Sequence, residues 1–380
     1  MSSLIVAGTV LIILLLSVML GKKNKLFADQ FLILYLVFAA IWHAYNYVEY
    51  LGLLQESYWM LMGKGFYLLH GPFFFLYVYA LITQKSLQAK HYVILFLPFI
   101  SYGLHFLYYY FFVFDKVALS ITDGLLYVNG EVSVSWLIFA VLFLIIDPIF
   151  LIIYYYLLSA YKKGLLDSVS NTDQINLQWL YVLFYLWLAI SVILVPFASL
   201  TLGSGWFSTD LLNLLIEIVS VAFYFVLGYY GFKQTTIFTN LELNEVLPLK
   251  GSSGNYERSG LSASQARDYH RQLLRLMEEK KPYLKGELTA SELSKSLGIS
   301  VNHLSQVLNK EQKQNFFDFI NSYRVKEVLL KMEDSGNSHL TLLALALDSG
   351  FNSKTSFNTI FKKVTSQTPS QYYKSITSKV

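Results

Sequence analysis

The sequence predicts an all-α protein, in which a seven-transmembrane-helix bundle is followed by a cytoplasmic domain with two helix-turn-helix units joined by a linker helix. Three observations lead to this fold class. Seven long apolar runs occupy the first 231 residues. The net charge changes sign along the chain, and one helix–glycine–helix pattern occurs twice near the C-terminus.

The composition divides the chain into two parts. Overall, 55% of residues are hydrophobic and 14% are charged, against roughly 25% charged residues in soluble domains. Residues 1–249 carry 10 Lys, no Arg and 13 Asp or Glu, a net charge of 10 − 13 = −3, whereas residues 250–380 carry 19 basic and 12 acidic residues, 19 − 12 = +7. The two parts therefore suit different solvents. There is no cysteine, which excludes disulfides and thiolate metal sites.

Each apolar run is long enough, or nearly so, to cross a membrane as a helix. About 20 apolar residues cross the roughly 30 Å hydrocarbon layer. The runs lie near residues 3–20, 29–50, 59–83, 91–114, 134–160, 178–201 and 210–231. Seven consecutive runs of this length favour a membrane bundle over the core helices of a large soluble protein.

Lysines between the runs predict the orientation of the bundle. Those that follow the first, third, fifth and seventh runs are Lys22, Lys23, Lys25, Lys85, Lys90, Lys162, Lys163 and Lys233; only Lys64 and Lys116 lie on the other side. Positive charge gathers on the cytoplasmic side, so we expect the N-terminus outside and the C-terminal domain in the cytoplasm. In the first run the charges of "GKKNK" come after the apolar stretch, whereas a signal peptide carries them before it. We therefore expect an uncleaved helix.

Four ionisable residues in the predicted spans are candidate sensor residues. An ionisable side chain at the bilayer centre costs about 2.5 kcal/mol or more, so each needs a reason to be there. The most central is Asp147, beside Pro148, and Glu217 is next; His43 and His70 lie in other spans. One interpretation is a ligand or proton site between helices. The other is a set of paired, buried structural groups.

The sequence predicts neither an enzyme nor a cofactor. His43, His70 and His105 lie in different predicted helices with no paired spacing, so no metal or haem site is expected. There is no glycine-rich phosphate loop, no recognisable Ser/His/Asp series and no HExxH motif. Transporters often show inverted repeats or broken helices, and neither is evident, although motifs alone leave a transporter open.

A polar segment separates the two parts of the chain. The stretch "NEVLPLKGSSGNYERSG", residues 244–260, is rich in Gly, Ser, Asn and charge, which is typical of a flexible tether. We therefore expect a transmembrane domain at 1–235, a cytoplasmic linker at 236–261 and a third domain at 262–380.

The first helix–glycine–helix unit is "LTASELSKSLGISVNHLSQVLNK", residues 288–310. Thr289 and Glu292 have the spacing of a capping box. Gly298 can take the left-handed conformation that ends a helix, and Ser300 can cap the next one. A helix with polar residues on its outer side fits the DNA major groove. The candidate base-reading residues of this unit are Asn302, His303 and Gln306.

The second unit, "LTLLALALDSGFNSKTSFNTIFKKV" at residues 340–364, repeats this plan with Thr341, Gly350 and Ser353. Between the units, "NFFDFINSYRVKEVLLKM" has one apolar helical face. About 16 helical residues span roughly 24 Å, which suits two reading helices in adjacent major-groove turns about 34 Å apart. Basic side chains can neutralise DNA phosphates. The candidates for that role are Lys310, Arg324, Lys354, Lys362 and Lys363.

Residues 262–375 resemble the AraC/XylS family of bacterial transcription regulators. The resemblance rests on the order and spacing of "LGISVNHLSQVLNK", "NFFDFINSYRV" and "DSGFNSKTSFNTIFKKVTSQTPSQYYKS". It implies a seven-helix domain with two helix-turn-helix units that activates or represses nearby promoters. Its base-reading positions carry over to Asn302, His303 and Gln306 in the first unit, and to Ser353, Lys354, Thr355 and Asn358 in the second.

Three residues depart from the pattern of that family. Lys313 and Ser366 stand where the family often has glycine, and Tyr373 stands where it often has arginine. The first two can alter the turns beside the reading helices, and the third removes a phosphate contact. None lies in a predicted reading helix, so DNA binding remains the expectation.

Together these patterns predict a one-component transcription regulator in the bacterial cytoplasmic (inner) membrane. The expected partners are double-stranded DNA and membrane lipid, together with a small-molecule or protein signal, a second copy of the chain as a homodimer, and RNA polymerase. A signal would shift an equilibrium between two arrangements, unless proteolysis in the 240–262 tether releases the DNA-binding domain. The alternatives are a membrane transporter or enzyme with a regulatory C-terminal domain, and a structural scaffold.

Overall fold

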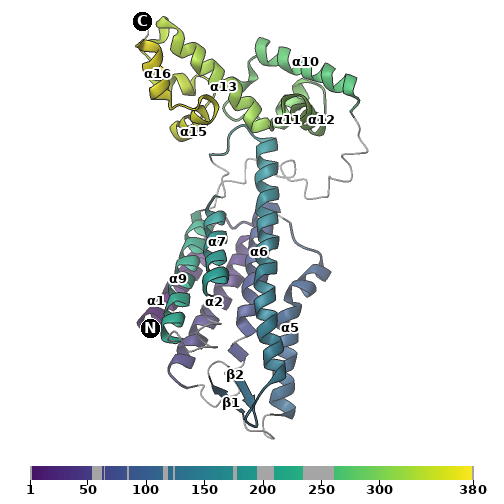
Figure 1. The fold of residues 1–380 in the computed structure, drawn as a ribbon, viewed down its shortest axis with the longest axis vertical. Coiled ribbons are helices and arrows are strands. Elements are labelled where there is room, and N and C mark those ends of the chain that lie inside the picture. The colour runs from purple at the N-terminus through teal and green to yellow at the C-terminus, as the bar shows by residue number, and fades with distance from the viewer. Residues whose placement is uncertain are drawn as a thin grey trace. The chain divides into compact units, whose positions relative to one another are not determined.

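The structure, a computed structural model, describes residues 2–53, 62–63, 65–83, 85–113, 119–122, 125–173, 178–194, 209–233 and 261–378, and it is almost entirely helical there (Figure 1). The chain divides into two compact units. The N-terminal unit consists of Met1–Ser159 and Leu177–Thr236, and the C-terminal unit of Ala160–Asn176 and Ile237–Val380. Residues 160–176, expected in the membrane domain, thus belong to the C-terminal unit. The boundaries at 235 and 261 border a predicted linker that lies outside the described residues up to residue 260.

The N-terminal unit is a bundle of apolar helices. They are α1 (Ser2–Gly21), α2 (Asp29–Tyr50), the 3-10 helix η1 (Gly65–Leu69), α4 (His70–Thr83), α5 (Ala89–Phe112), α6 (Val134–Ser168), α7 (Gln178–Ala189), the π-helical turn η3 (Ile190–Leu194) and α9 (Thr209–Lys233). Helix α1 packs on α2 and α9, and α2 packs on α4. A buried ion pair, with 2.7 Å between Lys22 Nζ and Asp29 Oδ2, fixes the connection between α1 and α2.

Six of these helices are long and apolar enough to cross a membrane, so the predicted count of seven is not confirmed. The six lie at Ser3–Gly21, Asp29–Tyr50, Gly65–Thr83, Ala89–Phe112, Leu144–Ser168 and Leu214–Lys233. In the sixth predicted span, 178–201, the described residues form a shorter apolar helix, Gln178–Val192. The remainder of that run, from residue 195, lies outside the described residues.

A small antiparallel sheet departs from the all-α prediction. It has the order β1–β2–β3, formed by Leu119–Thr122, Leu125–Val128 and Glu131–Val132. Val128 pairs with Glu131 across Asn129 and Gly130, both of which have positive φ angles of 53° and 84°. An Asn-Gly pair of this kind is the preferred two-residue hairpin loop. The signal was therefore present in the sequence and was missed.

The exterior of the N-terminal unit is apolar and its interior holds polar groups. On α5, side chains that are more than half exposed include Val93, Ile94, Leu97, Leu104 and Phe111. Soluble proteins rarely leave such a continuous apolar surface uncovered. Asp147, Glu217 and His43 are instead buried. This distribution suits a lipid environment, in which ionisable groups face the bundle interior.

Helix α6 is longer than a membrane span requires. Its 35 residues extend about 52 Å at 1.5 Å per residue, against roughly 30 Å for the hydrocarbon layer. The sequence predicted an end near residue 160, whereas the helix continues to Ser168. The part from Ala160 onward belongs to the C-terminal unit, so one unbroken helix contributes to both units.

Seven α-helices form residues 261–378 of the C-terminal unit, as the family resemblance implies (Figure 1). They are α10 (Ala263–Glu279), α11 (Ala290–Ser296), α12 (Val301–Val307), α13 (Phe316–Glu333), α14 (Leu342–Leu347), α15 (Lys354–Thr365) and α16 (Pro369–Thr377); short helical turns η4 (Pro282–Leu284), η5 (Leu308–Gln312) and η6 (Ser335–Asn337) lie between them. Helix α13 contributes to both apolar cores, with Phe319 and Ile320 in the first and Val325 and Val328 in the second.

The helix ends follow the predicted capping pattern. Thr289 and Glu292 form a reciprocal capping box at α11. Ser300 Oγ accepts from His303 N at the start of α12, over 3.1 Å. In the second unit, Thr341 and Ser353 cap α14 and α15 in the same way. Satisfying the free N–H groups at a helix start in this way contributes about 1 kcal/mol per cap.

Gly298 and Gly350 end the first helices of the two units with positive φ angles of 66° and 92°. A Cβ at Gly298 would have no neighbour within 4 Å, whereas one at Gly350 would collide with the carbonyl oxygen of Tyr283 and lie 3.0 Å from that of Leu284. The second glycine is therefore required by space as well as by backbone conformation.

We predict that Gly350→Ala destabilises the C-terminal unit more than Gly298→Ala does. The second substitution should cost about 1–2 kcal/mol from the left-handed conformation alone, and the first roughly 2–5 kcal/mol because overpacking is added. Urea-dependent pulse proteolysis of the full chain in micelles measures both values. Equal losses would contradict the crowding at Gly350.

Candidate nucleic-acid interface

The first helix-turn-helix unit presents a shorter polar surface than the sequence predicts. On α12, Asn302 is exposed and His303 is half-buried, with its ring stacked on Tyr269 at 6.3 Å between centroids. Gln306 was expected on the outer side, but it is only 5% exposed. Helix α12 packs on both α10 and α11, so less of its surface is open than that of an isolated reading helix. Of the three predicted base-reading residues, Asn302 and His303 therefore remain accessible.

The second unit exposes the predicted side chains more fully. Helix α15 begins at Lys354, and Lys354, Thr355 and Asn358 are exposed on it. Phe357, Ile360 and Phe361 face the core. This helix carries basic Lys362 and Lys363 in its last turn, where they also compensate the negative end of the helix dipole. Its outer face is thus polar at the start and basic at the end.

Positive φ angles at Lys313 and Ser366 account for the glycine preference at these positions. Their φ angles are 52° and 62°, and each residue directly follows a reading helix or its π-helical extension. The turns therefore keep the left-handed geometry that glycine adopts readily. The departures from the family pattern add backbone strain but do not change the course of the chain.

The predicted phosphate contacts differ in their availability. Lys310 and Lys362 are exposed. Lys363 Nζ donates to Asp318 Oδ1 over 2.6 Å, so it would have to exchange that carboxylate for a phosphate. Surface ion pairs of this type contribute little, and the exchange would be inexpensive.

Arg324 was predicted to contact phosphate, and the structure places it inside the C-terminal unit instead. Its guanidinium donates to the carbonyl oxygens of Tyr283 (2.8 Å), Lys285 (2.8 Å) and Gly286 (3.0 Å), and to the carbonyl and the hydroxyl of Ser170 (3.0 Å each). The residue is 1% exposed. Burial lowers the pKa of Arg324 to about 10, which leaves it charged at neutral pH. A buried guanidinium needs such a complete set of acceptors.

Ser170 follows the end of α6 and is held from several sides. Its backbone N–H and its hydroxyl both donate to Leu288 O, over 3.1 and 2.8 Å. Its carbonyl accepts from Asn321 Nδ2 over 3.0 Å, in addition to Arg324. The preceding Val169 forms an antiparallel bridge with Thr289, the N-cap of α11. Residues 169–170 are therefore part of the packed structure beside the first helix-turn-helix unit.

Asp173, three residues later, contacts the start of the second reading helix. Ser353 Oγ donates to Asp173 Oδ2 over 2.6 Å, while the same hydroxyl accepts from Ser356 N as the cap of α15. A helix N-terminus favours negative charge and binds phosphate readily. The carboxylate of Asp173 thus occupies a position that suits a DNA phosphate.

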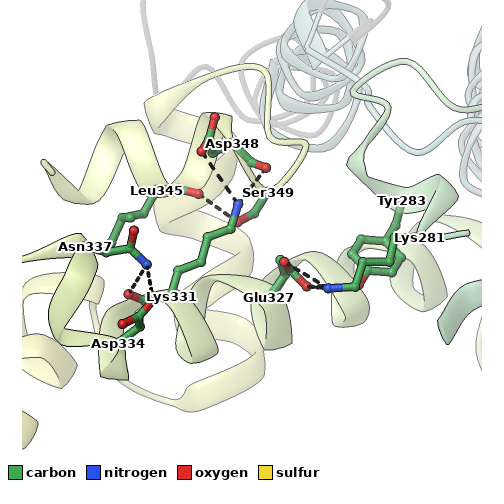
Figure 2. A network of polar contacts seen from close by, with 9 residues as sticks. All are labelled: Lys281, Tyr283, Glu327, Lys331, Asp334, Asn337, Leu345, Asp348 and Ser349. Carbon is green, nitrogen blue, oxygen red and sulfur yellow. Dashed lines mark hydrogen bonds and ion pairs between the residues drawn. The ribbon is translucent and has the colours of Figure 1, made fainter. Parts of the chain in front are cut away.

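A further polar network fastens α13 to both halves of the domain (Figure 2). Glu327 accepts from Lys281 Nζ and from Tyr283 Oη, each at 3.0 Å, and Lys331 Nζ donates to Asp348 O over 2.8 Å. Partial burial alone would raise the pKa of Glu327, but the hydrogen bonds from Lys281 and Tyr283 and the charge of Lys281 outweigh it, so that pKa lies below its usual value. The linker helix is thereby held on both sides.

The four predicted sensor residues all have partners within the N-terminal unit. Asp147 Oδ2 accepts from Trp187 Nε1 (3.2 Å) and Ser191 Oγ (2.5 Å). His43 Nδ1 lies 3.0 Å from Glu217 Oε1, without the angles of a hydrogen bond. His70 is hydrogen-bonded through Nδ1 to the hydroxyl of Tyr35. Asp147, Glu217 and His43 are thus partnered and buried, whereas His70 also lines a cavity.

Sequence reasoning did not find Ser170 and Asp173. They lie in "VSNTD", residues 169–173, between two apolar runs, and their contacts are residues about 120 to 180 positions further along the chain. Nothing in the local pattern indicates such partners. The one available signal was the position of Arg324 in the middle of the predicted linker helix, and the sequence pattern predicted a phosphate contact for that residue.

Comparison with known proteins supports a helix-turn-helix domain. Residues 293–375 match a family described as a helix-turn-helix domain. The chain is 36% identical over 86 residues to uncharacterized HTH-type transcriptional regulators of Staphylococcus aureus strains COL and MSSA476, an overlap of 23% of this chain. It spans only 11% of the length of those relatives. No solved structure matches the chain.

We predict that the salt dependence of DNA binding distinguishes Lys362, which is exposed, from Arg324, which is buried. In full-length protein bound to a random-sequence duplex, Lys362→Ala should reduce the slope of log K against log salt by about 0.9, the loss of one phosphate contact. Arg324→Lys should leave that slope unchanged and lower the stability of the C-terminal unit by about 2 kcal/mol or more, because several charge-assisted hydrogen bonds are lost.

Fluorescence anisotropy at several salt concentrations and urea-dependent pulse proteolysis give the two readouts. If Arg324→Lys reduced the slope and left stability intact, the guanidinium would have to reach the DNA, contrary to its buried position.

Proposed function

We propose that the protein is a membrane-anchored, one-component bacterial transcription regulator. Its C-terminal unit binds specific DNA sequences through α12 and α15, and a signal sensed by the N-terminal unit sets that binding. The observation that carries the proposal is the pair of capped reading helices. Each begins with a serine cap and exposed polar side chains. Their buried residues belong to the two apolar cores that share one helix, α13.

The base contacts are assigned to the side chains that are accessible. They are Asn302 and His303 on α12, and Lys354, Thr355 and Asn358 with the cap residue Ser353 at α15. Asn, Lys and hydroxyl side chains can recognise base edges in the major groove. Lys310, Lys362 and Lys363 supply phosphate contacts, which position the protein without reading sequence.

Location in the cytoplasmic membrane, with the C-terminal unit in the cytoplasm, is supported by the six apolar helices, by their exposed aliphatic side chains and by the distribution of lysines. The protein would regulate its genes while attached to the membrane. A second copy of the chain on the DNA and RNA polymerase are the further partners that this function needs.

Signal transfer would pass through α6 and the segment at residues 169–173. This helix belongs to both units, and the residues that follow it are buried against the first helix-turn-helix unit through Ser170. A change in the position of α6 must either move that unit or break these contacts. A transporter with a loosely attached regulatory domain would not need the hydrogen bonds that hold Ser170, directly after α6, against the first helix-turn-helix unit.

Asp173 gives this connection a direct effect on DNA binding. The hydroxyl of Ser353 has a single proton, which it donates to Asp173. A phosphate at the start of α15 would compete for the same proton and would meet the negative charge of the carboxylate. The arrangement described here is therefore the one with lower DNA affinity, and departure of the segment would raise that affinity.

DNA selection tests the reading function. Full-length protein in micelles should enrich a two-part motif from a random pool at near-physiological salt, with half-sites about one helical turn apart. Asn302→Ala should relax one half-site and Lys354→Ala the other, each by about 1–3 kcal/mol at the affected position. Enrichment of no sequence, with binding that disappears as salt rises, would contradict specific recognition.

We also predict that Asp173→Asn increases the affinity of the full-length protein for its selected site. Removing one negative charge at the N-terminus of α15 should strengthen binding by about two- to fivefold, in line with 0.3–1 kcal/mol for a helix-terminus charge. Asp167→Asn, which removes a charge from α6 instead, is the matched control. Weaker binding by Asp173→Asn would reverse the proposed role of the segment.

A further inference from the structure

The N-terminal unit contains a cavity of about 190 Å³ with an almost wholly apolar wall. Residues of α2, η1, α4, α7, η3 and α9 line it, and nine of its fifteen lining residues are Phe, Tyr or Trp. A cavity shared by this many helices is placed to change their packing when it is filled.

The rings around the cavity favour a planar occupant. The His70 ring stands edge-on to Trp187, with 5.1 Å between centroids and 87° between planes, and Phe38 stacks on Phe73 at 4.7 Å. Aromatic rings interact best with other rings in offset-stacked or edge-to-face geometry. A flexible acyl chain would cover similar area but would gain no such contacts, and it would lose more conformational freedom.

The lack of Asp, Glu, Lys and Arg among the described residues of the cavity wall excludes an ionic occupant. None of the fifteen lining residues is Asp, Glu, Lys or Arg. The nearby carboxylate of Asp147 is engaged by Trp187 and Ser191, and Glu217 faces His43. A charged ligand would be desolvated without a counter-ion, at high cost. The occupant must therefore be neutral.

The wall offers a polar group to such a ligand. The hydroxyl of Ser220, on α9, lines the cavity and makes no hydrogen bond within the described part of the chain. A ligand with one N–H, O–H or carbonyl group can bond to it. In size, an apolar cavity of about 150 Å³ holds benzene, so the present volume suits one ring or two fused rings.

We propose that this cavity binds a neutral, planar molecule of one or two fused rings that carries a single hydrogen-bonding group. The binding stands on the cavity alone. That this molecule is the signal of the regulator rests on the proposed function.

The test uses the full chain in phospholipid nanodiscs and 5-fluoroindole as the probe, followed by fluorine NMR. We expect saturable binding that unlabelled indole displaces. Ala39→Phe, which fills the cavity from α2, should weaken binding at least tenfold, whereas Ala44→Phe, on the exposed side of the same helix, should not. Ser220→Ala should weaken 5-fluoroindole about three- to tenfold, the loss of one hydrogen bond, and leave 2-fluoronaphthalene unaffected.

Three outcomes would overturn the proposal. Equal binding by the two phenylalanine variants would show that the probe only partitions into lipid. Displacement by dodecane but not by indole would assign the cavity to an acyl chain. If Ser220→Ala weakened the binding of 5-fluoroindole and 2-fluoronaphthalene equally, the ligand would make no hydrogen bond to Ser220. This comparison tests the proposal even if Ala39→Phe does not fold. DNA selection is a separate measurement, so its failure would refute the regulator and not the ligand site.

Discussion

The guanidinium of Arg324 is the interaction on which the C-terminal unit depends most. It joins carbonyl oxygens from the turn before α11 to the segment after α6, and it lies between the two apolar cores that α13 serves. Because its acceptors are neutral dipoles, the charge is balanced by geometry rather than by a counter-ion. Gly350 has no room for a side chain partly because Arg324 Nε lies beside it.

The two units handle polar groups in opposite ways. In the N-terminal unit, Asp147, Glu217 and His43 are buried inside the helices against partners of the same unit, while many aliphatic side chains are exposed. In the C-terminal unit, most charges of the described residues lie on the surface, and Arg324 is the charged residue that is buried there. The difference is the one expected between a unit that faces lipid and a unit that faces water. Helix α6 contributes to both units, and apart from the buried Asp147 its charged residues, Lys162, Lys163 and Asp167, all fall after residue 159.

Local features of the fold could be predicted from the sequence, and distant ones could not. The caps at Thr289, Ser300, Thr341 and Ser353 and the glycine ends need only residues within a few positions, and all of them are confirmed. The hairpin at Asn129 was equally local and was missed. Burial of Gln306 was not predicted, because it depends on how α10 and α11 pack on α12 and not on the pattern within α12 itself. The contacts of Ser170 join residues 118 to 154 positions apart, and a single sequence carries no signal for such pairs.

The unbroken course of α6 has a consequence for how the protein would find its targets. A regulator free in the cytoplasm searches the chromosome in three dimensions. Under the proposed function, the DNA-binding unit could not leave the membrane that holds the rest of the chain, so genes would have to come to it. Two copies that share one DNA site would then meet by diffusion in a plane, and the number of molecules per membrane area, rather than per cell volume, would set the occupancy of the promoter.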